Sequence, residues 1–215
     1  MRNTVISEIL KNKVIIILRG IPRDKLIPLC EALYDGGIRL VEITYSADGR
    51  VSDEETSDRI RQLCEKFQGR MYIGAGTVLK TSQVELTARA GGSFIISPDT
   101  KESVIKKTVE LGLVSIPGAL TPPESVIAHD FGADFVKLFP ISSFGASYIK
   151  ALVAPLSHIR FLAVGGVNAG NIPDFLNAGA VGVGIGGNVS SLLAEDNYAR
   201  ITEIAREYVR GAENG

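Results

Sequence analysis

Short apolar runs recur along the whole chain, and polar or amphipathic segments separate them. Most runs follow a segment of helical spacing that closes on glycine, as at Asp35-Gly36-Gly37 and Leu111-Gly112, where glycine supplies the left-handed residue that ends a helix. Strands that alternate with helices in this way pair in parallel. The pattern predicts eight strands, at Val14–Arg19, Leu40–Thr44, Met71–Gly74, Phe94–Ser97, Val114–Pro117, Asp134–Phe139, Phe161–Val164 and Val181–Ile185.

Two architectures combine parallel strands with helices, an open doubly wound sheet and a closed (β/α)8 barrel. Eight strand–helix units in a chain of 215 residues favour the barrel. The glycine-rich turn of a dinucleotide fold is missing after the first strand, where Leu18-Arg19-Gly20-Ile21-Pro22 stands instead. No linker or shift in composition divides the chain. We therefore expect one α/β domain over residues 1–215, a (β/α)8 TIM barrel, with a short helix at Val5–Lys11 that plugs the barrel floor.

One connection between a strand and the next helix is longer than the others. Residues Tyr45–Glu55 form a long polar stretch after the second strand. In a barrel this stretch would lie at the mouth, where it could act as a lid. The alternative is an ordinary solvated surface loop.

Charge and composition argue against several classes of protein. The 23 Lys and Arg nearly balance the 24 Asp and Glu, so nothing predicts a nucleic-acid-binding surface, and a small anionic ligand would have to be held locally. The amino terminus lacks the apolar run of a signal peptide, and no segment approaches the roughly 20 apolar residues of a membrane span. We expect a cytoplasmic protein with neither a membrane nor a nucleic-acid partner.

The cysteines and histidines do not form a metal-binding pattern. Cys30 and Cys64 fall in helix-like segments, and His129 and His158 lie far from them in the sequence. We interpret all four side chains as structural and expect no metal and no cofactor.

Lys137 is the most informative residue of the chain. It lies in Asp134-Phe135-Val136-Lys137-Leu138-Phe139-Pro140, which otherwise reads as a strand buried on both faces. Burial disfavours the charged amine, and a neutral lysine is a nucleophile for ketones. The alternative is a structural lysine that pairs with a carboxylate or extends past the strand end.

Glu42 interrupts the second strand in the same way. Apolar residues flank it in Leu40-Val41-Glu42-Ile43-Thr44. Strands two and six are both even-numbered, and alternate strands of a barrel contribute side chains to the same layers of its interior. Glu42 and Lys137 are therefore expected to face each other. A buried ion pair contributes little net stability, which favours a functional pair over a structural one.

Strands seven and eight both end in paired glycines. Gly165 and Gly166 follow strand seven, while Gly186 and Gly187, with Asn188, follow strand eight. Glycine lets a phosphate approach the backbone N–H groups, and these two loops are the frequent phosphate site of a TIM barrel. The alternative is that the glycines only permit tight turns.

Together these motifs resemble the 2-keto-3-deoxy-6-phosphogluconate (KDPG) aldolase family, also called the KDPG/KHG aldolases. The resemblance runs in order from about strand one to strand eight, and it implies a metal-free class I aldolase that assembles as a homotrimer. It further implies that Lys137 is the Schiff-base lysine, that Glu42 is the acid and base, and that Thr77, Pro98 and Phe139 line the pyruvate pocket. The motifs are Val-Glu42-Ile-Thr, Gly74-Ala75-Gly76-Thr77-Val78, Ile96-Ser97-Pro98, Ile116-Pro117-Gly118, Val136-Lys137-Leu138-Phe139-Pro140 and the two Gly-Gly turns.

The chain departs from the common pattern of that family at three positions. Ser46 stands where commoner members carry an arginine that would help hold the substrate carboxylate. Arg19 or Arg50 could replace it, since arginine donates two parallel hydrogen bonds to a carboxylate. Val164 stands for a usual threonine before the first Gly-Gly turn, and Asn188 stands for a usual serine after the second.

The reaction that the resemblance implies is cleavage of KDPG, or of a close 2-keto-3-deoxy sugar acid, to pyruvate and glyceraldehyde 3-phosphate. The gluconate and galactonate epimers and 4-hydroxy-2-ketoglutarate all stay candidate substrates. Two rival functions also fit the sequence: a sugar-phosphate isomerase or epimerase on the same barrel, and a non-catalytic protein, descended from an aldolase, that binds a phosphate ligand.

Overall fold

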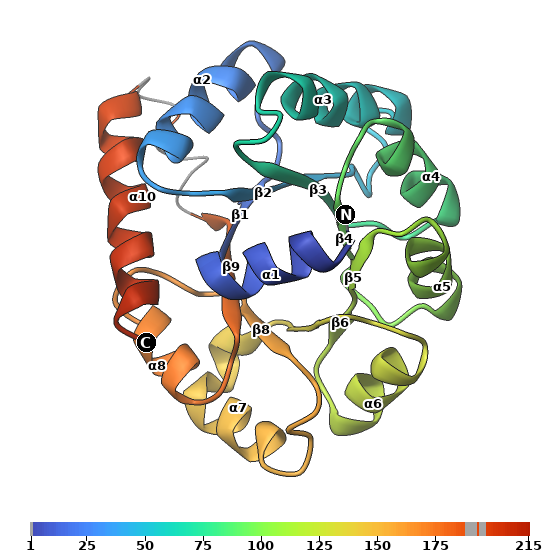
Figure 1. Ribbon diagram of the computed structural model, residues 1–215, viewed down its shortest axis with the longest axis vertical. Helices are drawn as coiled ribbons and strands as arrows, with labels where there is room; N and C mark the ends of the chain where they lie inside the picture. Colours follow the sequence, from blue (N-terminus) through green and yellow to red (C-terminus); the bar gives the residue numbers. More distant parts are fainter. Residues whose placement is uncertain (1, 188–192, 194–196) are drawn as a thin grey trace.

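The computed structural model describes residues 2–187, 193 and 197–215. Its strands form one sheet that curls into a barrel, with helices around the outside (Figure 1). Neighbouring strands pair in parallel, in the order β5-β4-β3-β2-β1-β9-β8-β7-β6. The strands are β1 Val14–Leu18, β2 Leu40–Thr44, β3 Tyr72–Gly76, β4 Phe94–Ile96, β5 Val114–Ile116, β6 Gly118–Ala119, β7 Val136–Leu138, β8 Phe161–Val164 and β9 Gly182–Ile185.

Proline splits the predicted fifth strand. The sequence predicts one strand over Val114–Pro117, but β5 pairs with β4 and β6 pairs with β7, and Pro117 separates them. Proline has no N–H to give to a ladder, so the strand is interrupted there. Because β5 and β6 are the two ends of the sheet and adjoin in the chain, the backbone closes the ring. The predicted (β/α)8 TIM barrel is confirmed, and the open doubly wound alternative is wrong.

Several helices end at glycine, as the sequence pattern predicts. Five of them are followed by a glycine with a positive φ, at Gly37, Gly91, Gly112, Gly132 and Gly179, which is the left-handed helix end that the pattern predicts. The helices are α1 Arg2–Asn12, α2 Arg23–Asp35, α3 Asp53–Lys66, α4 Thr81–Arg89, α5 Glu102–Glu110, α6 Pro122–Asp130, α7 Gly145–Val153, α8 Ile172–Asn177 and α10 Tyr198–Glu213, with a 3₁₀ turn, η1, at Ile141–Ser143.

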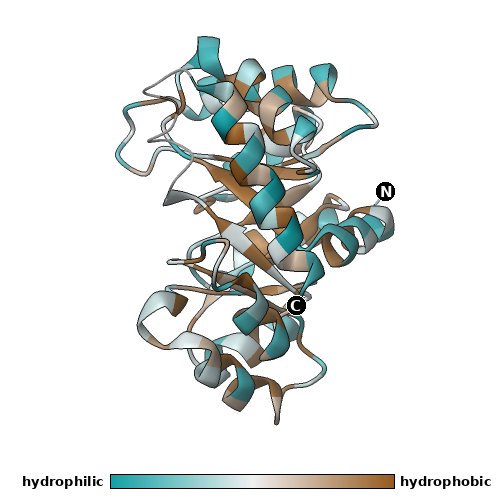
Figure 2. Ribbon diagram, turned by 90° about the vertical axis from the view of Figure 1, so that its left-hand side faces the viewer, coloured by the Kyte–Doolittle hydropathy of each residue, from teal (hydrophilic) through white to brown (hydrophobic). Residues whose placement is uncertain are grey.

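Two apolar clusters hold the barrel together. The larger lies between the strands and the surrounding helices, and Figure 2 shows the apolar strands inside the more polar helical layer. The smaller fills the barrel interior, where Val5 and Ile9 of α1 pack with Phe94 and Phe135. Helix α1 therefore crosses one end of the barrel (Figure 1), which leaves the other end for the site.

The long polar stretch after β2 is shorter than predicted. Helix α3 already begins at Asp53, because the Ser52 hydroxyl accepts a hydrogen bond from the Glu55 N–H at 3.0 Å and acidic residues occupy the first turn. The predicted loop over Tyr45–Glu55 is thus wrong at its carboxyl end. The loop proper covers residues 45–52.

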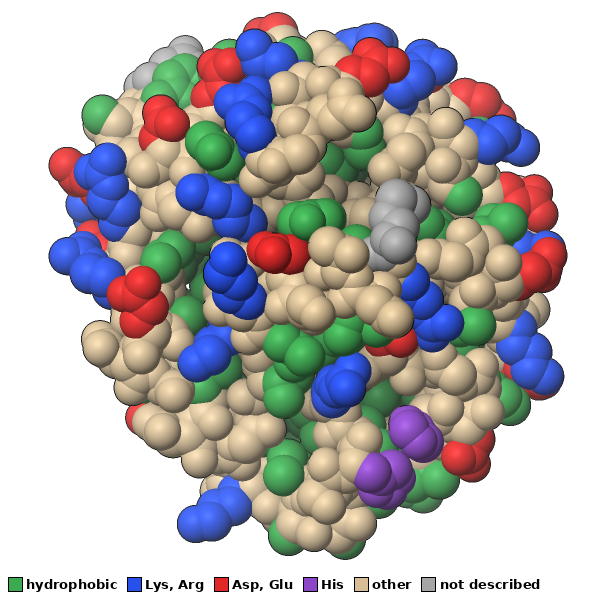
Figure 3. Space-filling model, in the orientation of Figure 1, with side chains coloured by type: hydrophobic (Ala, Val, Ile, Leu, Met, Phe, Trp, Pro, Cys, Tyr) green, Lys and Arg blue, Asp and Glu red, His purple; other side chains and the backbone are tan. Residues whose placement is uncertain are grey.

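The surface carries charges of both signs. Figure 3 shows basic and acidic side chains interspersed on the face that carries α1, where the two histidines also lie together. The rings of His129 and His158 are 5.0 Å apart. Across the part of the chain that the structure describes, no helix has the length and apolar character needed to span a membrane.

Candidate active site

Lys137 and Glu42 meet inside the barrel. Lys137 is the central residue of β7, flanked by Gly118 of β6 and Leu162 of β8. Its side chain and that of Glu42 both line a small buried cavity of about 10 Å³, a size that suits a single water molecule. Lys137 is 8% exposed and Glu42 is 1% exposed. The two strands thus bring both groups together from opposite sides of the barrel.

Burial moves the pKa values of the two groups toward each other. It raises the pKa of the Glu42 carboxyl to about 7, although the charges of Lys137 and Arg19 oppose the rise. It lowers the pKa of the Lys137 amine, an effect that Glu42 opposes and Arg19 reinforces. Near neutral pH the carboxyl can both accept and donate a proton, and the amine is shifted toward its nucleophilic form.

The Glu42 carboxylate has spare hydrogen-bonding capacity. Its Oε2 atom is buried and has no hydrogen-bond partner, which is rare for a carboxylate held only for structure. Gly76 provides the room for this side chain, because a Cβ atom at that position would lie 2.2 Å from Glu42 Oε1.

Lys137 also faces an open cavity of about 830 Å³ at the carboxyl ends of the strands. Its Nζ lies 4.7 Å from the centre of the Phe139 ring, which is 40% exposed. Glu42 lies deeper, at the buried cavity below. The predicted site residues that line the open cavity are Arg19, Thr77, Pro98, Lys137, Phe139, Gly165, Gly166, Gly186 and Gly187.

Thr77 is held in an unusual backbone conformation at this cavity. Its φ is 57°, a left-handed value that is rare for a β-branched residue. Its hydroxyl accepts a hydrogen bond of 3.1 Å from Arg19 Nη2. Strained backbone of this kind clusters at functional sites, and Thr77 and Arg19 both line the cavity.

The turn after β8 is built around two asparagines that the sequence reading missed. Asn171 Nδ2 donates to the Gly166 carbonyl at 3.0 Å, and Asn171 Oδ1 accepts from the Asn168 N–H at 2.8 Å. Gly165 and Gly166 both have positive φ, at 99° and 73°. An asparagine three residues after another in a glycine-rich loop is the signal that would have identified this turn. Asn188, predicted at the second glycine turn, lies outside the described residues.

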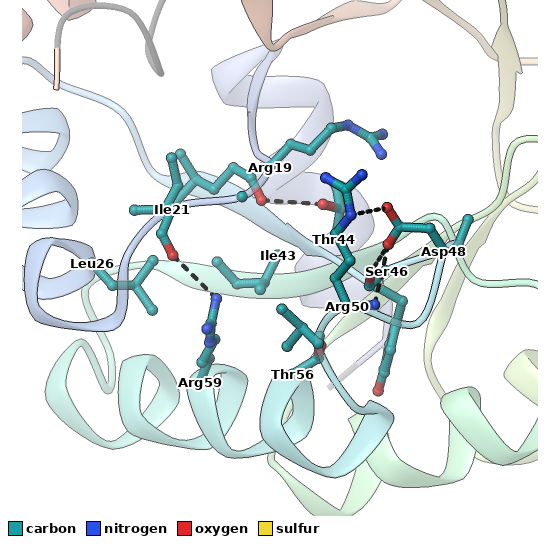
Figure 4. Close-up of a pocket in the computed structure, with 15 residues that line it drawn as sticks. Arg19, Ile21, Leu26, Ile43, Thr44, Ser46, Asp48, Arg50, Thr56 and Arg59 are labelled. Atoms are coloured by element: carbon teal, nitrogen blue, oxygen red, sulfur yellow. Dashed lines mark hydrogen bonds and ion pairs between the residues drawn. The ribbon is translucent and has the colours of Figure 1, made fainter. Parts of the chain in front are cut away.

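Ser46 and Arg50 lie beside the Lys137 cavity rather than in it. Both line a neighbouring pocket (Figure 4). The Ser46 hydroxyl donates to Asp48 at 2.5 Å, and Arg50 Nε forms an ion pair with Asp48 at 2.9 Å. Of the two arginines considered for the substrate carboxylate, Arg19 is the one at the Lys137 cavity.

The cysteines lie away from the cavity. Cys30 is buried in α2 and Cys64 is partly buried in α3, and both thiols are free. Burial raises the pKa of Cys64 to about 12 and raises the pKa of Cys30 as well. Over the described ranges, no three His, Cys, Asp or Glu side chains gather in a group that could hold a metal ion.

Comparison with known proteins identifies the family. The family model described as KDPG and KHG aldolase matches residues 5–204. This chain belongs to the KDPG and KHG aldolase family. The resemblance seen in the sequence motifs is thereby confirmed, and membership of this family makes the protein an aldolase, and so a lyase.

Relatives within the family agree over most of the chain. The chain is 37% identical over 180 residues to the 2-dehydro-3-deoxy-6-phosphogalactonate aldolase of Escherichia coli strain K12, which covers 83% of this chain and 85% of that protein. It is 34% identical over 190 residues to the KHG/KDPG aldolase of the same organism, with coverage of 86% and 85%. Among solved structures, the native KDPGal structure superposes with a TM-score of 0.83 at 36% identity and covers 93% of this chain and 94% of its own.

Proposed function

We propose that the protein is a class I aldolase that cleaves a 2-keto-3-deoxy-6-phospho sugar acid through a Schiff base on Lys137. The observation that carries this proposal is a buried lysine with a lowered pKa that lines an open cavity and shares a buried cavity with Glu42. A solved relative supports it. The KDPG aldolase of Legionella pneumophila, 25% identical with a TM-score of 0.83, holds pyruvate as a covalent carbinolamine intermediate.

The reaction begins at the ketone. The neutral Lys137 amine attacks C2 of the sugar acid, a C–N bond forms, and the ketone oxygen leaves as water to give an iminium. Glu42 accepts the proton of the C4 hydroxyl through a bridging water, since its carboxylate lies deeper than the amine. The C3–C4 bond then breaks, its electrons move to the iminium, and glyceraldehyde 3-phosphate departs.

The second half returns the proton. Pyruvate remains attached to Lys137 as an enamine, and Glu42 gives the proton back to C3. Water then hydrolyses the iminium, which releases pyruvate and restores the free amine. A carboxyl with a pKa of about 7 suits both directions of transfer, because each form is populated near neutral pH.

The remaining cavity residues bind the two ends of the substrate. We place the carboxylate at the Arg19 guanidinium and the Thr77 hydroxyl, which already bond to each other at 3.1 Å. The Gly165-Gly166 and Gly186-Gly187 turns line the same cavity, and their backbone N–H groups suit the phosphate. Relatives named for the galactonate and for the gluconate acid both match this chain, so both epimers belong in the assay.

The first test is borohydride reduction in the presence of pyruvate, followed by peptide mass spectrometry. A pyruvyl adduct on Lys137 is expected in the wild type and not in Lys137→Met. Lys150→Met is the matched control, because Lys150 is an exposed lysine of α7 and its loss should leave the adduct in place. Folded protein that forms no adduct in excess pyruvate contradicts the Schiff-base mechanism.

Assays on the same purified protein distinguish an aldolase from the two rival functions. Pyruvate release from either epimer, followed with lactate dehydrogenase, is expected for an aldolase. Turnover of a sugar phosphate without release of pyruvate would instead indicate an isomerase or epimerase. Thermal stabilisation by the sugar acid without turnover would indicate a binding protein.

A further inference from the structure

A second pocket opens beside the Lys137 cavity. It has a volume of about 420 Å³ and lies between the carboxyl ends of β1 and β2, the 45–52 loop and α3 (Figure 4). Among the residues that the structure describes, Arg19 is the one that lines both spaces. The volume falls within the range of small-molecule sites, and the catalytic steps proposed above leave this pocket unused.

The floor of this second pocket is apolar. Ile21, Leu26 and Ile43 line it, and each is at most 4% exposed. They come from the loop after β1, from α2 and from β2, so the surrounding fold sets the shape of the floor. Such a surface favours a ligand with a hydrocarbon body over a bare inorganic ion.

The polar part of the pocket is cationic. Arg19, Arg50 and Arg59 line it, and Asp48 is the one acidic side chain among its described lining residues. Arg50 donates to Asp48 through Nε, which leaves the two terminal nitrogens of its guanidinium for another acceptor. The Arg50 side chain is 87% exposed, so it can turn toward a ligand at little cost.

Arg59 approaches the pocket from below. Its Nη1 donates to the Ile21 carbonyl at 3.1 Å and its Nη2 pairs with Glu55 at 2.6 Å, while its buried Nε has no hydrogen-bond partner. Arg19 is assigned to the substrate carboxylate, so Arg50 and Arg59 are the cations that this pocket offers to a second ligand. A carboxylate is the organic group that guanidinium groups bind best through paired hydrogen bonds.

We propose that this pocket binds a small organic monocarboxylate, with its apolar body on the Ile21, Leu26 and Ile43 floor and its carboxylate on the Arg50 and Arg59 guanidinium groups. A planar guanidinium matches a carboxylate with two parallel hydrogen bonds. The proposal is independent of the Schiff-base chemistry, since Arg50 and Arg59 line this pocket and are not among the residues that line the Lys137 cavity.

The test is a ¹⁹F NMR titration of the whole chain with 4-fluorobenzoate, with 4-fluorobenzyl alcohol as the uncharged comparison. We expect the benzoate to bind about ten- to a hundred-fold more tightly than the alcohol, the ratio that one charge-assisted hydrogen-bonded contact supplies. Arg50→Gln is expected to weaken the benzoate about tenfold. Val51→Trp keeps every charge but fills the pocket, and it is expected to abolish binding.

Two control variants locate the probe. Arg61→Gln removes an exposed arginine of α3, two residues beyond Arg59, that pairs with Asp58 outside the pocket, and binding is expected to be unchanged. Phe139→Ala alters the Lys137 cavity and is also expected to leave binding unchanged. The proposal would be overturned if Phe139→Ala lost binding, if Arg50→Gln and Val51→Trp bound the benzoate as tightly as the wild type, or if the wild type did not bind it. None of these outcomes would affect the borohydride result.

Discussion

At the scale of single residues, Glu42 and Lys137 show how one environment prepares two different groups. The same apolar surroundings favour the neutral carboxyl and the neutral amine. Their opposite charges reduce both shifts without cancelling them. A carboxyl with a raised pKa and an amine with a lowered pKa thus follow mainly from burial, before any substrate is present.

The pKa of Glu42 has a consequence for activity. The carboxylate is the form that accepts the proton of the C4 hydroxyl, so kcat/KM is expected to fall as the pH drops below about 7. Glu42→Gln should slow turnover by roughly 10²- to 10⁴-fold and remove this acid limb. Glu54→Gln, an exposed glutamate of α3, is the control. An unchanged acid limb in Glu42→Gln would assign it to another group.

The same shift has a consequence for stability. The folded carboxyl holds its proton up to about pH 7, against 4.5 as its ordinary value, so its contribution to stability is complete below about 4.5 and is lost as the pH rises to about 7. Urea unfolding of the wild type and of Glu42→Gln is expected to show the wild type losing stability relative to the variant across this window. A constant difference between the two would contradict the shift.

Gly76 is expected to matter for chemistry rather than for the backbone. In Gly76→Ala the new Cβ would lie 2.2 Å from Glu42 Oε1, so the carboxylate must move, and kcat is expected to fall by about 10²-fold. Gly92→Ala is the matched control, because its Cβ would meet Thr87 Cγ2 at 2.5 Å, away from the site. Both variants should lose about 1–3 kcal/mol of stability, but Gly92→Ala should keep its kcat.

At the scale of elements, helix α1 is fastened to the barrel by a specific ion pair as well as by apolar packing. Arg2 donates to Asp134 through Nε at 3.1 Å and through Nη2 at 2.9 Å. Asp134 also accepts from the Ser115 N–H at 2.9 Å. The carboxylate therefore joins α1 to the segments that carry β5 and β7.

Removal of this ion pair is expected to affect folding and not catalysis. Arg2→Ala should lower the free energy of unfolding by roughly 1–2 kcal/mol, because the Asp134 side chain is only 9% exposed. Arg61→Ala breaks a pair whose side chains are 57% and 46% exposed, and it should cost less than about 1 kcal/mol. Chemical denaturation checks both. A fall in kcat for Arg2→Ala would mean that α1 also positions the site.

At the scale of the whole molecule, we propose that the chain assembles as a homotrimer, as its resemblance to the family implies. Phe144, which lies outside the Lys137 cavity, is 43% exposed, and a partner chain would cover such apolar surface. Sedimentation equilibrium is expected to give three times the mass of one chain at micromolar concentration. A single-chain mass under these conditions would contradict the proposal.

The sequence by itself determined the eight strand–helix units and the two polar residues that do not belong in apolar strands. Both signals are local: periodicity shows which segments bury a face, and Lys137 or Glu42 in such a segment stands out without knowledge of its neighbours. The sequence also marked the glycine turns that line the cavity. Pro117, by contrast, reads as the end of a strand, although the chain resumes as β6 beyond it.

Only the tertiary structure decided which side chains share a space. Barrel closure sets the register of distant strands, and this register brings Arg19 to Thr77, sets Gly76 against Glu42 and moves Ser46 and Arg50 into a separate pocket. Such pairings depend on contacts between residues far apart in the chain, which leave no periodic trace in the sequence. Burial then fixed the pKa of Glu42, because the loss of water around a carboxyl depends on everything packed against it.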